Sequence, residues 1–289
     1  MKGGTLKRYF PIFVLPTLLS FLLVFAIPFV MGILLSFTEF STVESATFVG
    51  LKNYLRAFAP ADGFLRSLGF TALLAICVVI AVNFVALALA LLLTKKIRAT
   101  ALFRGVFFLP NLIGGIVLGY IWNLLLGGIL SYFGLDITYF ASLGFLGLLL
   151  LSVWQLSGYM MVIYIAALLS IPKETEQAAM VDGATSFQLL RFVKLPQIAP
   201  SIAVCTFLTL TNTFKMFDQN LALTQGAPGR ETEMLALHIF RTFYGRVGWQ
   251  GVAQAKGVLF FIVVAGLSAL QLYFSRERKD KTWRKSKQI

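Results

Sequence analysis

The sequence predicts an all-α polytopic membrane protein with six transmembrane helices and both termini in the cytoplasm. Of its 289 residues, 58% are apolar and only 13% are charged, whereas soluble domains have about half apolar and a quarter charged residues. The apolar residues lie in long uncharged runs, and a helix needs about 20 of them to cross the hydrocarbon core. The basic residues are also divided unevenly between alternate connections. A water-soluble enzyme is therefore excluded.

Six uncharged runs define the predicted spans, since a helix pairs its backbone groups internally, as hydrocarbon requires. The runs are residues 9–38, 67–94, 105–135, 137–172, 195–214 and 257–275. Only Asp136 and a short polar stretch separate the third run from the fourth, so that boundary stays open. The prolines at positions 11, 16, 28 and 110 predict kinks rather than breaks, because neighbouring helices can satisfy the freed carbonyls.

The distribution of Lys and Arg predicts the orientation of the chain. Residues 1–8, the second and fourth connections and residues 276–289 together hold 17 of the 25 basic residues. The positive-inside rule places this richer side in the cytoplasm. We therefore expect a cytoplasmic N-terminus at 1–8, a transmembrane domain at 9–275 and a basic cytoplasmic tail at 276–289. The net charge of +13 is explained by topology and lipid contacts, and we expect no nucleic-acid partner.

The connection at residues 172–196 has the pattern of a helix followed by a sharp turn. Pro172 suits the first turn of a helix, where its missing N–H costs nothing. Glu174 and Glu176 follow near the positive end of that helix's dipole. Gly183 then permits a backbone conformation that other residues avoid. The stretch therefore predicts a first short helix that ends at this glycine.

A second short helix is predicted after the turn. Thr185 or Ser186 can cap its start, and Leu195-Pro196 is expected to end it and lead into the fifth span. A helix–turn–helix of this kind either docks in a groove on a partner or rests on the lipid surface. The pattern alone leaves both interpretations open.

The same residues resemble a known motif. Gln177-Ala178-Ala179, three residues, Gly183, nine residues and Val193-x-Leu195-Pro196 are similar to the EAA loop of ABC-importer permeases. The stretches Ala166-Ala167-Leu168, Ile171-Pro172-Lys173-Glu174 and Val181-Asp182-Gly183-Ala184 resemble the carbohydrate branch of those permeases. Further similarities are at Val49 to Tyr54, Phe103-Arg104, Phe108-Leu109-Pro110, Trp122, Phe217-Asp218 and Leu223 to Pro228. Together they cover roughly residues 10 to 275.

The resemblance implies a type I ABC importer permease fold in a bacterial inner membrane. It implies half of a carbohydrate pathway, and a second homologous permease as partner. Two copies of a cytoplasmic ABC ATPase and an extracytoplasmic sugar-binding protein are the other implied partners. No phosphate-binding GxxxxGK[ST] motif occurs in the chain. We therefore expect no cofactor, metal or enzymatic activity on this chain, with ATP and Mg²⁺ held by the ATPase.

The resemblance also assigns candidate residues for coupling to the ATPase. They are Glu174, Glu176, Gln177, Ala178, Ala179, Asp182, Gly183, Leu195 and Pro196. The family's coupling Glu is replaced by Gln177, which forms hydrogen bonds but carries no charge for an ion pair. Glu176 stands one residue earlier. Whether Gln177 or Glu176 makes the coupling contact is left open.

Polar and small residues in the spans are candidates for the substrate path. By the resemblance they are Asn111, Gly115, Ser152, Gln155, Leu156, Thr209, Thr213 and Met216, and helix packing is the alternative for each. Asn83 is interpreted as a hydrogen-bonding link between helices. Lys215 and Asp218 are expected to pair or to shape the outer end of the fifth span. His238, the only histidine, is expected at the surface or in packing.

Two other functional classes are less consistent with the sequence. A stand-alone secondary transporter or channel would favour charged residues in the middle of its spans, and the predicted spans are almost devoid of them. An integral-membrane enzyme would need a cluster of catalytic residues, and the sequence offers none.

Overall fold

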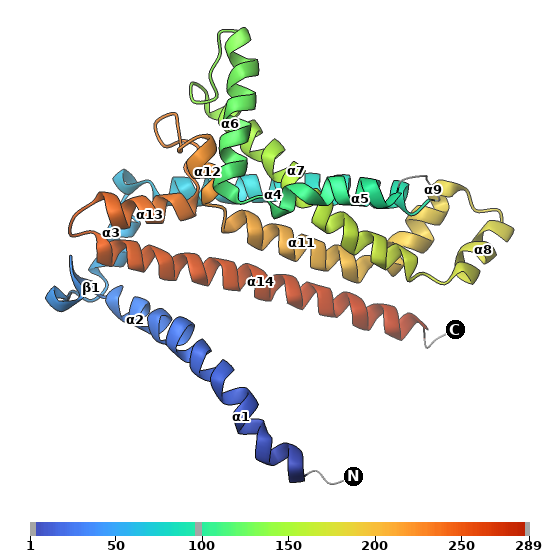
Figure 1. Ribbon diagram of the computed structural model, residues 1–289, viewed down its shortest axis with the longest axis horizontal. Coiled ribbons are helices and arrows are strands. Elements are labelled where there is room, and N and C mark those ends of the chain that lie inside the picture. Colours follow the sequence, from blue (N-terminus) through green and yellow to red (C-terminus); the bar gives the residue numbers. More distant parts are fainter. Residues whose placement is uncertain (1–3, 96–99, 287–289) are drawn as a thin grey trace. The chain divides into compact units, whose positions relative to one another are not determined.

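The computed structural model describes residues 4–95 and 100–286, and these are mostly helical (Figure 1). The chain divides into two compact units. The first consists of Met1–Phe64 with Ile239–Ile262, and the second of Leu65–His238 with Val263–Ile289.

The first unit begins with a long interrupted helix. Its elements are α1 (Gly4–Phe21), the π-helical turn η1 (Leu22–Ala26), α2 (Ile27–Leu35), β1 (Thr38–Glu39), η2 (Val43–Ser45), β2 (Thr47–Phe48), α3 (Lys52–Ala57) and η3 (Pro60–Asp62). The π turn lies just before Pro28, which has no N–H for the carbonyl of the preceding turn. The helix therefore continues through Pro28 with a local irregularity. Strands β1 and β2 pair antiparallel.

Residues at the start of β1 make close contacts inside this unit. The buried side chain of Asn53 donates hydrogen bonds to the carbonyls of Ser36 and Thr38, at 2.9 and 2.8 Å. A Cβ on Gly251, near the start of α14 (Gln250–Ser286), would lie 1.9 Å from the Thr38 carbonyl oxygen. Only glycine therefore allows this approach of two backbones. Phe29 packs edge-to-face on Phe261 at 4.9 Å.

A buried ion cluster also lies within the first unit. The Asp62 carboxylate forms two ion pairs: Oδ2 lies 2.6 Å from Lys256 Nζ, and Oδ1 lies 2.9 Å from Arg246 Nη1. The Lys256 side chain is fully buried and also donates to Thr242 at 2.9 Å. The cluster joins residues that follow α3 to α14 and to the C-terminal part of α13 (Leu235–Gly245).

The second unit contains most of the helices. They are α4 (Phe64–Leu93), α5 (Thr100–Phe108), η4 (Leu109–Leu112), α6 (Gly115–Tyr132), α7 (Ala141–Leu169), α8 (Lys173–Val181), α9 (Ser186–Gln188), η5 (Leu189–Lys194), α10 (Leu195–Gln197), α11 (Ala199–Phe214) and α12 (Asp218–Leu223). Its core is built around α7, where Leu148, Leu151 and Met160 are fully buried. Tyr164 of α7 donates to Asn83 of α4. This bond is the helix–helix link that the sequence suggests for Asn83.

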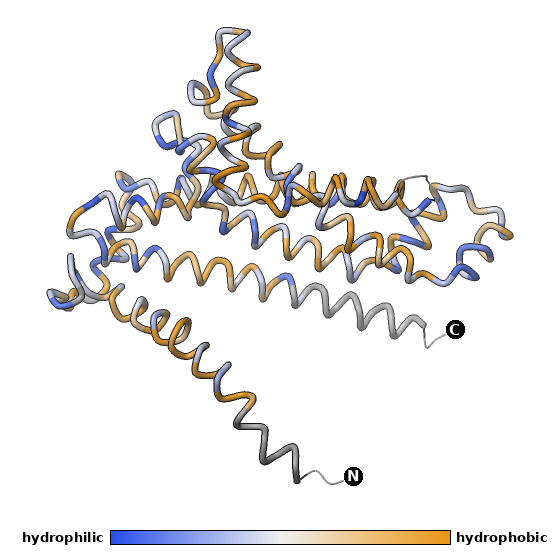
Figure 2. The backbone as a smooth tube through the Cα atoms, viewed as in Figure 1, coloured by the Kyte–Doolittle hydropathy of each residue, from blue (hydrophilic) through white to orange (hydrophobic). Residues whose placement is uncertain are grey.

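Five helices in the described residues are long and apolar enough to cross a membrane. They are Phe13–Leu35, Phe64–Leu93, Gly115–Tyr132, Ala141–Leu169 and Gln250–Gln271. A sixth is obtained if Ser186–Gln197 and Ala199–Phe214, bent by 71°, count as one span. Figure 2 shows orange, hydrophobic backbone along these helices. The six predicted spans are therefore found, although their orientation stays a prediction.

Two local predictions are wrong. Pro110 lies in η4, which separates α5 from α6, so it breaks the third run instead of kinking it. The second short helix ends as predicted to within one residue, at Gln197 directly after Leu195-Pro196, and a bend of 71° leads into Ala199–Phe214. The last span begins at Gln250 instead of residue 257, so the buried Lys256 lies inside it. The open boundary between the third and fourth spans lies between Tyr132 and Ala141.

Candidate functional site

The predicted helix–turn–helix is present, and we call residues 172–197 the knob. Pro172 directly precedes α8 and makes no capping side-chain hydrogen bond. Gly183 follows α8 with φ of +82°, a conformation that favours glycine. Thr185 caps α9 in a capping box. Its hydroxyl accepts a hydrogen bond from the backbone N–H of Gln188, and its own backbone N–H donates to Gln188 Oε1. Figure 1 shows the knob at the right-hand end of the helices of the second unit.

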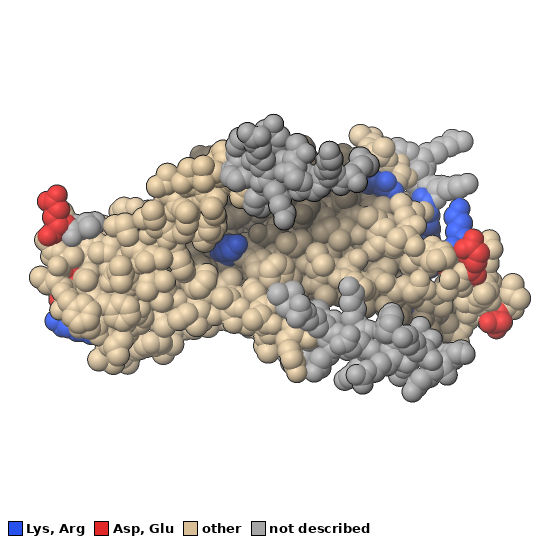
Figure 3. All heavy atoms as spheres, turned by 90° about the horizontal axis from the view of Figure 1, so that it is seen from below, with Lys and Arg blue, Asp and Glu red and all other residues tan. Residues whose placement is uncertain are grey.

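The knob presents polar and apolar side chains to its surroundings. The coupling candidates Glu174, Gln177, Ala178 and Asp182 are exposed, and no residue of α8 is buried. Large apolar side chains are exposed beside them, namely Met180, Val181, Phe187 and Phe192. Acidic and basic atoms gather at the right-hand end of Figure 3, where α8 lies in Figure 1. This mixture suits a protein–protein contact better than a purely apolar face would.

Glu176 differs from the other acidic residues of the knob because its carboxylate is engaged. Glu176 Oε2 lies 2.9 Å from Lys194 Nζ, and the two side chains are 24% and 23% exposed. The ion pair connects α8 to the last residue of η5. The neighbouring Gln177 is exposed and has no hydrogen-bond partner in the part of the chain that the structure describes.

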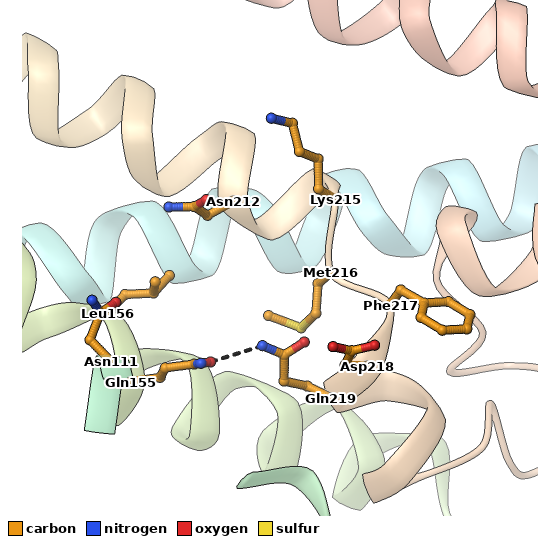
Figure 4. A pocket seen from close by; sticks show the side chains of 9 residues that line it. All are labelled: Asn111, Gln155, Leu156, Asn212, Lys215, Met216, Phe217, Asp218 and Gln219. Carbon is orange, nitrogen blue, oxygen red and sulfur yellow. Dashed lines mark hydrogen bonds between the residues drawn. The ribbon is translucent and has the colours of Figure 1, made fainter. Parts of the chain in front are cut away.

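A second candidate site is a pocket of about 380 Å³ in the second unit (Figure 4). Its lining residues come from η4, α7, α11, α12 and the segment 215–217 between the last two: Asn111, Gln155, Leu156, Asn212, Lys215, Met216, Phe217, Asp218 and Gln219. Gln219 Nε2 donates to Gln155 Oε1 at 2.9 Å, which joins α12 to α7. Most of the polar lining is thus made of uncharged amides.

Four of the eight predicted path residues line this pocket, namely Asn111, Gln155, Leu156 and Met216. The other four lie outside its lining. A Cβ on Gly115 would be 2.7 Å from the Asp218 Cβ, so this glycine allows α6 to approach α12 closely. Gly119 allows the same approach one turn on, where a Cβ would be 2.7 Å from that of Ala222.

The three remaining hydroxyl residues are fully buried. Ser152 donates to the Leu148 carbonyl at 2.6 Å and contacts Met216 Sδ at 3.9 Å. Thr213 donates to the Thr209 carbonyl at 2.8 Å. These two hydroxyls thus bond carbonyls one turn earlier in their own helices, whereas the buried Thr209 hydroxyl has no hydrogen-bond partner in the described residues.

The pocket lining also contains Asn212, Phe217 and Gln219, which the sequence did not indicate, together with Lys215 and Asp218. Asn212 directly precedes Thr213, and its side chain points about 100° away from that of Thr213 around α11. The break at residues 215–217 turns the chain from α11 into α12 and brings Gln219 back toward α7. No sequence signal marks this reversal.

Two expectations about charged residues are resolved. Lys215 and Asp218 form no ion pair in the described part of the chain, and Figure 4 shows the Lys215 side chain extending away from the Asp218 carboxylate. They therefore shape the pocket without pairing. His238 is buried in packing, with its Nδ1 3.1 Å from Glu233 Oε2, a partner that the sequence analysis missed.

Comparison with known proteins identifies the chain's relatives. Residues 98–280 match the family described as "Binding-protein-dependent transport system inner membrane component". The chain is 42% identical to a probable starch degradation products transport system permease protein of Thermoanaerobacterium thermosulfurigenes, over 93% of this chain and 94% of that protein. It is 27% identical to a trehalose/maltose transport system permease protein of Thermococcus litoralis, over 91% and 92%.

A solved structure shares the fold. A chain of a bacterial ABC transporter involved in the import of the acidic polysaccharide alginate superposes with a TM-score of 0.80 at 21% identity, covering 94% of this chain and 97% of that one. The residues matched by the family include the whole knob and the whole pocket. The chain therefore belongs to the family of binding-protein-dependent transport system inner membrane components, and it is a multi-pass membrane subunit of an ABC transporter and not an enzyme.

Proposed function

We propose that this permease forms half of the pathway through which an ATP-driven importer moves a carbohydrate into the cell. A second homologous permease supplies the other half, two copies of a cytoplasmic ABC ATPase supply the energy, and an extracytoplasmic sugar-binding protein delivers the substrate. The observation that carries the proposal is the pocket lined by amides. One of these amides, Asn212, lies on α11, the helix that directly follows the knob. Relatives that are named as permeases for starch degradation products and for trehalose and maltose support a carbohydrate as substrate.

The pocket has the chemistry that a sugar requires. Asn111 and Asn212 have no hydrogen-bond partner in the described residues, so their amides are available to both donate to and accept from sugar hydroxyls. Leu156 and Met216 offer apolar surface to the faces of a sugar ring. A volume of about 380 Å³ lies in the range of small-molecule sites. In a complete transporter the second permease would close the remaining side.

The knob provides the connection to the ATPase. We propose that its exposed surface docks in a cleft on that subunit and follows the cleft as nucleotide binding closes it. The two membrane halves then rock between inward-open and outward-open forms. Such a population shift needs only that nucleotide be bound more tightly in one form than in the other.

Replacing Asn212 by Leu should raise the KM for carbohydrate transport about tenfold, because one hydrogen-bonding amide is exchanged for an apolar group in a pocket that binds hydroxyls. Transport into proteoliposomes that hold the complete importer measures this. Thr211→Val is the matched control, since the Thr211 hydroxyl donates only to carbonyls within its own helix. An unchanged KM in Asn212→Leu would remove the pocket from the path.

Replacing Gly183 by Pro should abolish co-purification of the ATPase while the chain still inserts in the membrane. Proline fixes φ near −65°, and residue 183 has φ of +82°. Gly134→Pro is the control, because Gly134 has φ of +69°, lies in open space and is far from the knob in sequence. ATPase that stays bound to the Gly183→Pro variant would contradict docking through the knob.

Reconstitution of the purified chain by itself tests the energy source. We expect no carbohydrate uptake by liposomes that contain only this polypeptide, and uptake that depends on ATP when all partners are present. Transport by the chain alone would instead support a secondary transporter or channel.

A further inference from the structure

We propose that Glu176 is a positioning residue that braces the knob through Lys194, and that the uncharged amide of Gln177 makes the contact with the ATPase at this point. The inference rests on the proposed docking of the knob. It decides between the two residues that the sequence leaves as alternatives.

The knob has two arms: the first is α8, and the second is the continuous helical stretch of α9, η5 and α10 (residues 186–197). The ion pair connects these two arms at a distance from the Gly183 turn. Glu176 lies in the middle of α8, and Lys194 is the last residue of η5, directly before Leu195-Pro196. Their charged atoms are 2.9 Å apart, and both side chains are about three-quarters buried. Neither residue forms another ion pair within the residues that the structure describes. The carboxylate of Glu176 is therefore directed at the second arm.

Helix α8 also approaches η5 along the backbone, but few side chains are buried there. No residue of α8 is buried, and only Leu189 is buried in η5. Apolar packing between the arms is thus sparse, and the Gly183 turn by itself fixes only one end of each arm. A movement of α8 reaches α11 only if the two arms of the knob keep a fixed angle and move as one rigid body. The ion pair fixes that angle where the second arm leads into α11.

Gln177 is placed differently from Glu176. Consecutive residues on a helix point about 100° apart, so a side chain next to an inward-facing Glu176 faces another direction. Gln177 is exposed and has no partner within the described chain. If the Glu176 carboxylate instead paired with a cation on the ATPase, its ion pair with Lys194 would have to break. Gln177 can contact the ATPase without this loss.

Five variants, measured in the complete importer, separate these roles: two neutral single variants, the charge exchange, Glu176→Lys by itself and Gln177→Ala. Glu176→Gln and Lys194→Met should each lower substrate-stimulated ATPase activity about fivefold, the upper effect of a partly exposed ion pair. The exchange Glu176→Lys with Lys194→Glu should restore activity to within about twofold of wild type, because the brace is rebuilt with reversed charges. Gln177→Ala should reduce ATPase co-purification.

Contrary outcomes are distinct. If Lys194→Met behaves like wild type while Glu176→Gln does not, or if the charge exchange is no better than Glu176→Lys by itself, then Glu176 contacts the partner and the brace is wrong. Should the exchange variant be poorly produced, the comparison of the two single neutral variants still decides. Gln177→Ala with normal co-purification contradicts the amide contact. Failure of the wild-type chain to bind the ATPase at all would instead overturn the proposed function.

Discussion

Asp62→Asn should destabilise the purified protein by about 3 kcal/mol or more, which is the usual cost of removing one partner from a buried ion pair. Asp62 receives Lys256 at 2.6 Å and Arg246 at 2.9 Å, and the Lys256 side chain is fully buried. An asparagine keeps the size of the side chain but removes the negative charge that faces two cations. The buried ammonium group then remains without this carboxylate, and hydrogen bonding to Thr242 does not replace it.

Thermal unfolding in detergent measures the effect. Glu39→Gln is the matched control, because Glu39 also faces two cations, Lys52 and Arg56, but the pairs are exposed and 3.4 Å long. We expect little change there, since water screens exposed pairs. Adding Lys256→Met to Asp62→Asn should recover much of the loss, because the buried positive charge that faced the lost carboxylate is also removed. A melting temperature of Asp62→Asn equal to that of Glu39→Gln would contradict this role.

Gly158→Ala should destabilise the second unit by about 3 kcal/mol, the upper cost of overpacking a well-filled contact. A Cβ at residue 158 would lie 1.8 Å from the carbonyl oxygen of Phe107 and 2.9 Å from the Cα of Phe108. These are backbone atoms at the end of α5, so no side-chain rotation relieves the contact. Helix α5 or α7 has to move, and the move displaces η4 with its pocket residue Asn111.

The same measurement on Gly127→Ala provides the comparison. Gly127 lies in α6, and a Cβ there meets no atom within 4 Å. Alanine favours a helix over glycine by up to about 1 kcal/mol, so this variant should be as stable as wild type or slightly more so. Equal melting temperatures for the two alanine variants would show that α5 and α7 do not approach as closely as we describe.

The membrane-crossing helices could be predicted from the sequence because hydrocarbon imposes a local requirement. A run such as residues 67–94 has to be helical throughout, whatever its neighbours are. The knob could also be predicted, because Pro172, Gly183 and Thr185 act on their own backbone. The break at Pro110 could not, since it depends on whether neighbouring helices satisfy the freed carbonyls.

The contacts that build the candidate sites are long-range and could not be predicted. Gln155 and Gln219 are 64 residues apart, and Arg246 and Asp62 are 184 apart. The residue types are compatible with many pairings, and only the folded helices select one. Lys256 illustrates the difficulty, because a charge next to an apolar run resembles the end of a span until its buried partner is known.

A bend of 71° separates Ser186–Gln197, in the knob, from Ala199–Phe214, the helix that carries the pocket residue Asn212. Helix α11 has 16 residues and is therefore about 24 Å long. A tilt of about 10° around Ile198 displaces its far end, next to Asn212 and Met216, by about 4 Å. A displacement of that size exceeds the length of a hydrogen bond. Under the coupling that we propose, a small rotation of the knob would therefore be enough to break hydrogen bonds between a sugar and the Asn212 amide.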